Sequence, residues 1–221
     1  MIWADSIQSF NQALKIEAKL PKGVDVLNPF KEAVTAELSA TFYRKYYNDN
    51  HNRSLILGIN PGRFGAGLTG VPFTDPVKLE ARCGIKNNLP KKAELSADFI
   101  WAMIDAYGRP EDFFNRYYIS SVSPLGFTQA GKNLNYYDDK RLEKAVTPFI
   151  VDSIRAQLDF GLDVSVCYCL GEGKNFHFLQ NLNGKYKFFA SLVPLPHPRF
   201  IMQYRRKKLE EYIAFYTHKL S

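Results

Sequence analysis

Along most of the chain, the pattern of hydrophobic and polar positions alternates between one typical of strands and one typical of helices. Four short apolar runs bounded by turn-forming residues predict buried strands at 55–59, 117–122, 164–170 and 187–193. Apolar positions three and four residues apart predict helices over about 5–19, 29–47, 77–82, 96–107, 139–160, 174–182 and 202–219, with a shorter one led by Pro110. This order predicts an α/β fold, a three-layer α/β/α arrangement with a central, mainly parallel four-stranded sheet, in a single domain over 1–221.

Helix boundaries carry their own signals. Asn28 as cap and Pro29 at the first position open the second helix, and Ser96 is expected to cap the helix over 96–107. Pro148 lies inside the 139–160 pattern, where it predicts a kink or a break near Thr147.

The ends of all four predicted strands carry polar or glycine residues: Asn60, then Ser121 with Ser123, then Gly171, then His197. The carboxyl ends of parallel strands lie on one edge of a sheet, where ligands bind in open α/β folds. Asn60 and His197 are therefore expected near each other if the first and fourth strands are close. Taken singly, Asn60 before Pro61 also fits an ordinary turn, and His197 fits a structural histidine.

Bulk composition suits one folded unit. The 221 residues are 46% hydrophobic and hold no Gly/Ser linker, no apolar run of membrane-spanning length and no signal-peptide start, so we expect a cytoplasmic protein. Three cysteines suit buried, reduced thiols rather than an iron-sulfur cluster. The remaining histidines show no ligand spacing, so no metal site is expected.

The chain is basic, with net charge +7, and Arg205, Arg206, Lys207 and Lys208 are consecutive. In a helix starting near Met202 they would occupy the first two turns, where the helix dipole disfavours each cation by roughly 0.3–1 kcal/mol. A nucleic-acid backbone would favour that placement, since neutralised phosphates release counterions. The alternative is a solvated basic face.

Residues 65–70 match the dinucleotide fingerprint G-x-G-x-x-G in letters only. The fingerprint requires its glycines directly after a strand and opening a helix, whereas here the strand ends at Ile59 and Pro72 follows the glycines. No Gly-Lys-Ser/Thr and no Gly-x-Ser-x-Gly occurs, and Asp75 has no obvious carboxylate partner for glycosidase chemistry. The pattern therefore predicts no nucleotide cofactor. Phe73, after the glycines, either plugs the core or offers a ring for a flat base to stack on.

Three segments resemble the SMUG-type uracil-DNA glycosylases. GINPGRFGAGLTGVPF at 58–73 is similar to the family's first motif, YISSVSPLGFTQAGKNL at 118–134 to its middle segment, and LVPLPHPRF at 192–200 to its second motif. The resemblance implies a uracil-DNA glycosylase-like fold and a monofunctional DNA glycosylase of base excision repair. Such an enzyme flips a deaminated base out of DNA and hydrolyses its bond to the sugar. It implies DNA as partner, no cofactor, no metal, no membrane, and a monomer.

The resemblance also implies roles for particular residues. Asn60 would handle the attacking water, His197 would stabilise charge on the departing base, and Phe73 would stack on that base. The other residues expected to contact the base are Gly58, Ile59, Gly62, Phe64 and Ser121. Those expected to contact DNA are Arg63, Lys132, Arg199, Phe200, Arg205, Arg206, Lys207 and Lys208.

Two departures from the family pattern affect specificity. Ser121 stands where family members have an Asn that reads the uracil edge, and a hydroxyl makes fewer simultaneous hydrogen bonds than an amide. Xanthine, hypoxanthine and hydroxymethyluracil thus join uracil as expected substrates. Arg199 follows His197 by two positions rather than four, so Phe200 is expected to share the role of filling the vacated stack. The alternatives are a noncatalytic DNA-binding or damage-sensing module on the same fold and an enzyme acting on free nucleosides.

Overall fold

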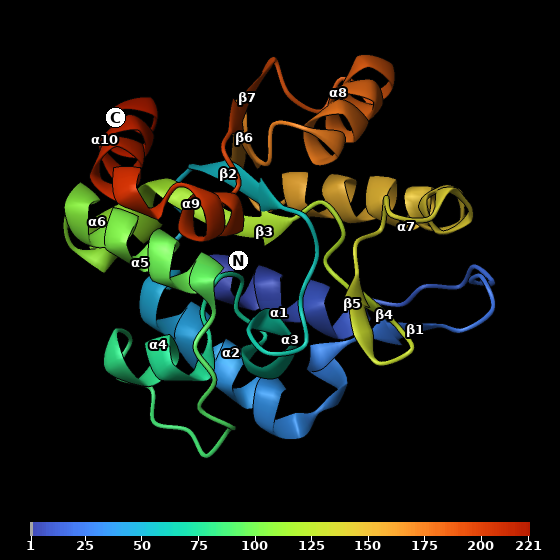
Figure 1. The fold of residues 1–221 in the computed structure, drawn as a ribbon, viewed down its shortest axis with the longest axis horizontal. Helices are drawn as coiled ribbons and strands as arrows, with labels where there is room; N and C mark the ends of the chain where they lie inside the picture. Colours follow the sequence, from blue (N-terminus) through green and yellow to red (C-terminus); the bar gives the residue numbers. More distant parts are fainter. Residues whose placement is uncertain (1) are drawn as a thin grey trace.

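A four-stranded parallel sheet forms the centre of the computed structural model, which describes residues 2–221 (Figure 1). Its strand order is β3-β2-β6-β7, and all three strand pairs are parallel. The strands are β2 (Arg53–Gly58), β3 (Tyr117–Ser121), β6 (Leu162–Leu170) and β7 (Ser191–Leu195). The predicted fold class is confirmed. Asn60 and His197 follow β2 and β7, which are separated by β6, so these two residues are not on adjacent strands.

Helices connect the strands and cover the sheet. They are α1 (Trp3–Ala13), α2 (Ala33–Tyr46), α3 (Ala66–Thr69), α4 (Pro76–Ala81), α5 (Leu95–Tyr107), α6 (Pro110–Arg116), α7 (Lys140–Leu158), α8 (Lys174–Tyr186), α9 (Pro198–Tyr204) and α10 (Leu209–Lys219). Two 3-10 turns, Pro29–Lys31 and Arg206–Lys208, precede α2 and α10. No helix in the described part of the chain has both the length and the apolar character that a membrane crossing requires.

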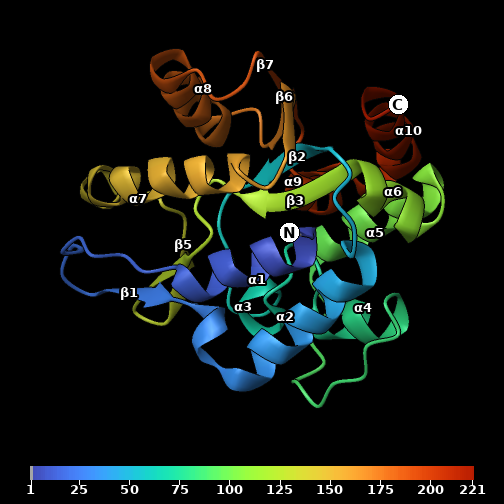
Figure 2. The same cartoon turned by 180° about the vertical axis from the view of Figure 1, so that it is seen from behind.

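Two neighbouring tyrosines of β3 show how the layers are built. Successive side chains of a strand point to opposite faces. Tyr117 packs against Tyr107 of α5 and Phe113 of α6, whereas Tyr118 packs against Trp3 of α1 and against α2. Helices therefore bury both faces of the sheet, and Figures 1 and 2 show α5 and α6 well separated from α7 and α8.

A second, antiparallel sheet of order β1-β4-β5 was not predicted. Its strands, β1 (Val24–Leu27), β4 (Gly126–Gln129) and β5 (Lys132–Leu134), are short and only partly buried, so they carry little apolar alternation. A two-residue hairpin joins β4 to β5, with Ala130 and Gly131 at φ 48° and 71°, the left-handed values that such turns favour. This sheet fixes the chain that leaves β5 toward the strand ends of the main sheet.

Several predicted boundaries were wrong in the first half of the chain. The first helix ends at Ala13 rather than at 19, because Leu14 is extended and its carbonyl accepts from the Asn28 side chain at 3.1 Å. The helix over 29–47 is a 3-10 turn followed by α2, and Asn28 does cap it by accepting from Phe30 N. Ser96 is not a cap. It lies in the first turn of α5, which begins at Leu95.

Pro148 does not break the long helix, which runs unbroken from Lys140 to Leu158 as α7. An internal proline costs about 3 kcal/mol. The buried face of α7, with Leu142, Val146, Ile150 and Ile154 each 0% exposed, offsets that cost, since burying one such side chain contributes about 1.5–3 kcal/mol.

The fourth strand was predicted four residues too early. Helix α8 extends to Tyr186, Lys187 ends it in a left-handed conformation, and β7 begins only at Ser191. Phe188 and Phe189 are buried in the core without being part of a strand. Their apolar character was misread as strand pattern.

The last helix is also divided, which corrects the interpretation of the basic run. Helix α9 begins at Pro198 and ends at Tyr204, Arg205 follows it, and the cations at 206–208 form a 3-10 turn before α10. Arg205 thus lies at the carboxyl end of α9, where a cation is favoured, and Glu210 and Glu211 occupy the first turn of α10. The expectation that all four cations occupy the first two turns of one helix was therefore wrong, although Lys208 still adjoins the amino end of α10.

Candidate active site

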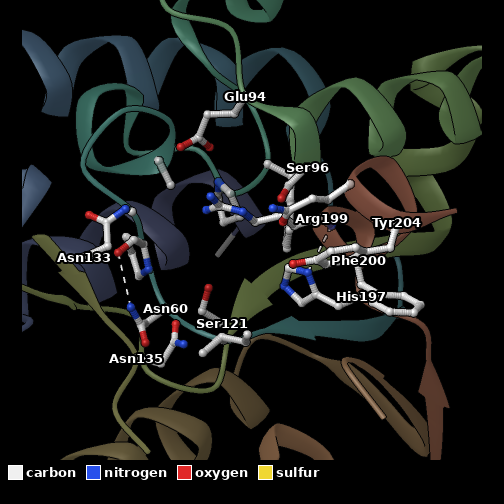
Figure 3. A pocket seen from close by; sticks show the side chains of 17 residues that line it. Asn60, Glu94, Ser96, Ser121, Asn133, Asn135, His197, Arg199, Phe200 and Tyr204 are labelled. Carbon is white, nitrogen blue, oxygen red and sulfur yellow. Dashed lines mark hydrogen bonds between the residues drawn. The ribbon is translucent and has the colours of Figure 1, made fainter. Parts of the chain in front are cut away.

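A pocket of about 450 Å³ opens at the carboxyl ends of β2, β3 and β7 (Figure 3). That volume lies within the range of sites that hold small organic groups. Asn60, Ser121 and Asn135 lie on one side, and His197, Phe200 and Tyr204 on the other. The remaining lining residues are Ile59, Pro61, Gly62, Ala66, Pro72, Phe73, Glu94, Ser96, Asn133, Arg199 and Gln203.

Phe73 is held in place by the strand that it covers. A Cβ atom at Gly58 would lie 2.9 Å from the Phe73 ring, so only glycine permits this close packing. Phe73 itself has φ 53°, a left-handed value that is unusual for a bulky residue. Strain of this kind often accompanies functional sites. The ring lies 6.4 Å from the His197 ring, centroid to centroid, and so forms part of the pocket wall.

The Asn60 side chain is fixed by backbone groups. Its Oδ1 accepts from Tyr136 N at 3.1 Å, and its Nδ2 lies 3.3 Å from both Leu134 O and Pro61 O. These bonds use both amide protons and one lone pair of Oδ1. The second lone pair of Oδ1 has no partner among residues 2–221 and remains for a ligand.

His197 caps α9 through its ring. Its Nδ1 accepts from Arg199 N at 3.1 Å, and Pro198 takes the first helical position. Burial, with a smaller effect of the Arg199 cation, lowers the pKa of His197 to about 4. The ring is therefore neutral at pH 7, and because Nδ1 accepts, the proton resides on Nε2. His197 thus offers one N–H donor beside the pocket.

Ser121 ends β3 directly opposite Gly58 of β2. It is 6% exposed and lines the pocket, and no partner for its hydroxyl is found among residues 2–221. A hydroxyl in a pocket wall that has no protein partner is available to a ligand.

Cations and an aromatic ring flank the pocket on the side of the glycine loop, the segment over residues 62–70. The Phe64 ring has the Arg63 guanidinium 4.8 Å and the Lys92 ammonium 3.7 Å from its centroid. Asn133 Oδ1 accepts from Arg63 N at 3.1 Å and from Arg63 Nε at 3.3 Å, which ties β5 to this loop. Lys132, the neighbour of Asn133, is exposed.

A carboxylate also faces the pocket. A Cβ atom at Gly65 would collide with Glu94 Oε2, so the loop and the carboxylate are in close contact. Burial, and then the nearby Asp75 charge, raise the pKa of Glu94, while Arg199 acts in the opposite direction. Glu94 and Arg199, both in the pocket lining, are therefore close enough for their charges to interact.

The structure places the sequence-predicted residues in three groups. Those that line the pocket are Ile59, Asn60, Gly62, Phe73, Ser121, His197, Arg199 and Phe200. Gly58 lies behind Phe73, and Phe64 packs between Arg63 and Lys92 rather than lining the pocket. Lys132 and the exposed run at 205–208 lie outside it.

Sequence reasoning missed several residues of this region: Lys92, Glu94, Asn133, Asn135, Gln203 and Tyr204. They come from loops, from the unpredicted β5 and from α9, so no strand-end pattern marked them. Tyr204 is 63% exposed, and its ring neighbours that of Phe200, at 5.7 Å between centroids. Such an exposed aromatic pair, ending directly before a basic run, was the available signal.

A parallel sheet with an Asn-Pro-Gly loop and a His-Pro helix cap at its strand ends is the arrangement that the resemblance to the DNA glycosylases implies. The chain belongs to the uracil DNA glycosylase superfamily, whose family model matches residues 44–221. The crystal structure of wild-type Pedobacter heparinus SMUG2 is similar over 100% of this chain and 97% of that chain, with 49% sequence identity and a TM-score of 0.97. These matches confirm the family and the enzyme class expected from the three motifs.

Proposed function

We propose that the protein is a monofunctional glycosylase that removes uracil from DNA, and with it xanthine, hypoxanthine or hydroxymethyluracil. The observation that carries this proposal is the pairing of Asn60 and His197 across a base-sized pocket with Phe73 in its wall. A fixed carbonyl oxygen, a neutral N–H donor and an aromatic ring are the groups that hydrolysis of a flipped nucleotide requires.

In the proposed reaction, water attacks C1′ of the flipped nucleotide. The C1′–N bond breaks, and its electron pair goes to the base. Asn60 Oδ1 accepts a hydrogen bond from the attacking water, which donates its proton to solvent. The neutral His197 donates from Nε2 to an oxygen of the base, where negative charge develops. The products are the free base and an abasic site.

Water is favoured over an amine as the nucleophile. Among the described residues, no lysine lines the pocket, and an amine would be needed for a lyase reaction through a Schiff base. This supports a monofunctional enzyme. We propose that it acts as a monomer, because the pocket is formed from one chain.

DNA binding is proposed for both rims of the pocket. Arg63, Lys92 and Lys132 lie on the glycine-loop side, and Arg199 with the run at 205–208 on the α9 side. Phe200 and Tyr204 are exposed between these cations and the pocket. Their rings are suited to stacking on the bases that neighbour the flipped nucleotide.

The direct test uses labelled oligonucleotides that carry one uracil, xanthine, hypoxanthine or hydroxymethyluracil, followed by alkali to cut abasic sites. We expect cleavage by the parent, and Asn60→Ala and His197→Ala should each lose about 10²–10³ in rate while still binding DNA. A parent that leaves every modified base intact but binds DNA would support the noncatalytic alternative. Release of bases from free nucleosides would support the other alternative, an enzyme that acts on free nucleosides.

A further inference from the structure

We propose that the Asn135 side chain reads the edge of the flipped base, a role that Ser121 is too short to fill alone. The inference rests on the proposed base excision and names the group that sets its specificity. Asn135 follows β5 by one residue, and its side chain lines the pocket on the same side as Asn60 and Ser121 (Figure 3).

The other asparagine amides beside the pocket already have partners, and Gln203, the remaining amide, is exposed on α9. Asn60 uses both amide protons on Pro61 O and Leu134 O, and Asn133 accepts twice from Arg63. The Asn135 amide has no hydrogen-bond partner within residues 2–221, although it is only partly exposed. An amide with a free donor and a free acceptor is the group that a base edge can satisfy.

The backbone around Asn135 is held from both sides. Asn135 N donates to Asp138 Oδ2 at 2.9 Å, and Asp138 N donates back to Asn135 O at 3.0 Å. The flanking residues both bond to Asn60, Leu134 through its carbonyl and Tyr136 through its N–H. The residue that would bind water and the residue that would read the base therefore share one support, which fixes their separation.

Deaminated bases share the feature that an amide recognises. Uracil, xanthine and hypoxanthine each present a ring N–H beside a carbonyl oxygen, to which one amide gives an acceptor and a donor. Cytosine and adenine present the reverse, a ring nitrogen that accepts beside an amino group that donates. A single amide that serves all three deaminated bases agrees with a broad substrate range.

The test combines a protein change with a substrate change. Single-turnover excision rates are measured for the parent and Asn135→Ala on oligonucleotides with uracil or 4-thiouracil, whose sulfur is a weaker hydrogen-bond acceptor than oxygen. We expect Asn135→Ala to lose at least about 10-fold on uracil, the discrimination typical of one good base contact. Its loss on 4-thiouracil should be smaller, so that the ratio of the two rates falls at least about threefold from the parent ratio.

Asn133→Ala is the matched control, because it removes an amide two positions away that bonds Arg63 instead. It should weaken DNA binding but keep the parent ratio of rates. An Asn135→Ala ratio equal to that of the parent would overturn the inference, whether both rates fall together or neither falls. A parent that excises none of the bases would instead overturn the proposed function.

Discussion

Tyr136 N donates to Asn60 Oδ1 at 3.1 Å, although 76 positions separate the two residues in the sequence. Tyr136 is anchored in turn, since its hydroxyl donates to Asn175 Oδ1 at 2.7 Å and Asn175 Nδ2 donates to Gly58 O at 3.3 Å. The four residues thus form a closed chain of contacts that joins the end of β2, the start of α8 and the segment after β5. This chain fixes the orientation of the Asn60 amide in the pocket wall.

Tyr136→Phe should therefore slow excision. Loss of one buried hydrogen bond costs about 0.5–1.5 kcal/mol, and transmitted to Asn60 it should lower the single-turnover rate about three- to tenfold. Tyr47→Phe is the matched control, because it removes a buried hydroxyl that donates to Tyr117 O at 3.1 Å, at the start of β3 and so at the opposite end of the parallel strands from Asn60. Thermal unfolding and excision rates are measured for both. Equal effects of the two variants on the rate would show that Tyr136 acts only through stability.

Asn60→Asp should be destabilising as well as inactive. The change replaces the Nδ2 donor with an oxygen that faces Leu134 O and Pro61 O, two acceptors at 3.3 Å in the parent. Unpaired acceptors in a half-buried site cost about 1–3 kcal/mol. Chemical denaturation at neutral pH gives the free energy of unfolding of Asn60→Asp and Asn60→Ala. If the Asp variant is as stable as the Ala variant, the two carbonyl oxygens do not destabilise a carboxylate at this position.

His197→Gln should change how stability depends on pH. In the folded protein the pKa of His197 is about 4, against 6.5 for an ordinary histidine, so between these values the unfolded chain binds more protons. Stability from neutral His197 is therefore complete above pH 6.5 and is lost as pH falls toward 4, a difference of about 3 kcal/mol. The free energy of unfolding, measured by denaturation at several pH values from 4 to 8, should change less with pH in the variant than in the parent. The same pH dependence of the unfolding free energy in parent and variant would show that burial does not lower the pKa of His197.

Ser121→Asn should narrow substrate preference toward uracil. The residue ends β3 at 6% exposure with its hydroxyl toward the pocket, so a longer amide must project into the space that a purine would need. The ratio of excision rates for uracil over xanthine should rise at least about tenfold, the value of one good base contact. An unchanged ratio would remove Ser121 from the base-binding surface.

Within the basic run at 205–208, Arg206 and Lys207 should contribute most to DNA binding. Lys208 Nζ is 3.1 Å from Glu211, and Arg205 lies over the Phe200 ring, whereas neither Arg206 nor Lys207 has an ion-pair partner in the described chain. Replacing both by Ala should weaken binding to all DNA sequences and lower the salt slope by about 1–2. Titrations at several salt concentrations measure the slope. A slope like that of the parent would leave these residues as an ordinary solvated surface.

The sequence by itself determined the sheet, the polar strand ends and the three motifs. An apolar run that stops at Asn60 predicts a buried strand and the position of its end. This prediction does not depend on the rest of the fold, because the run of apolar residues is a local signal. The same holds for His197 between two prolines. These local signals located the active-site edge and identified the family before any contact was known.

Only the tertiary structure decided which groups meet at that edge. Asn135 and Glu94 lie in loops without periodicity, and their nearness to Asn60 and Gly65 arises from the small antiparallel sheet and the segment before α5. The unbroken α7 and the late β7 likewise depended on long-range burial, which outweighed the local preferences of Pro148 and of the residues after Lys187. Hydrogen bonds across 76 positions leave no pattern in the sequence, since their energy is gained only once the chain has folded.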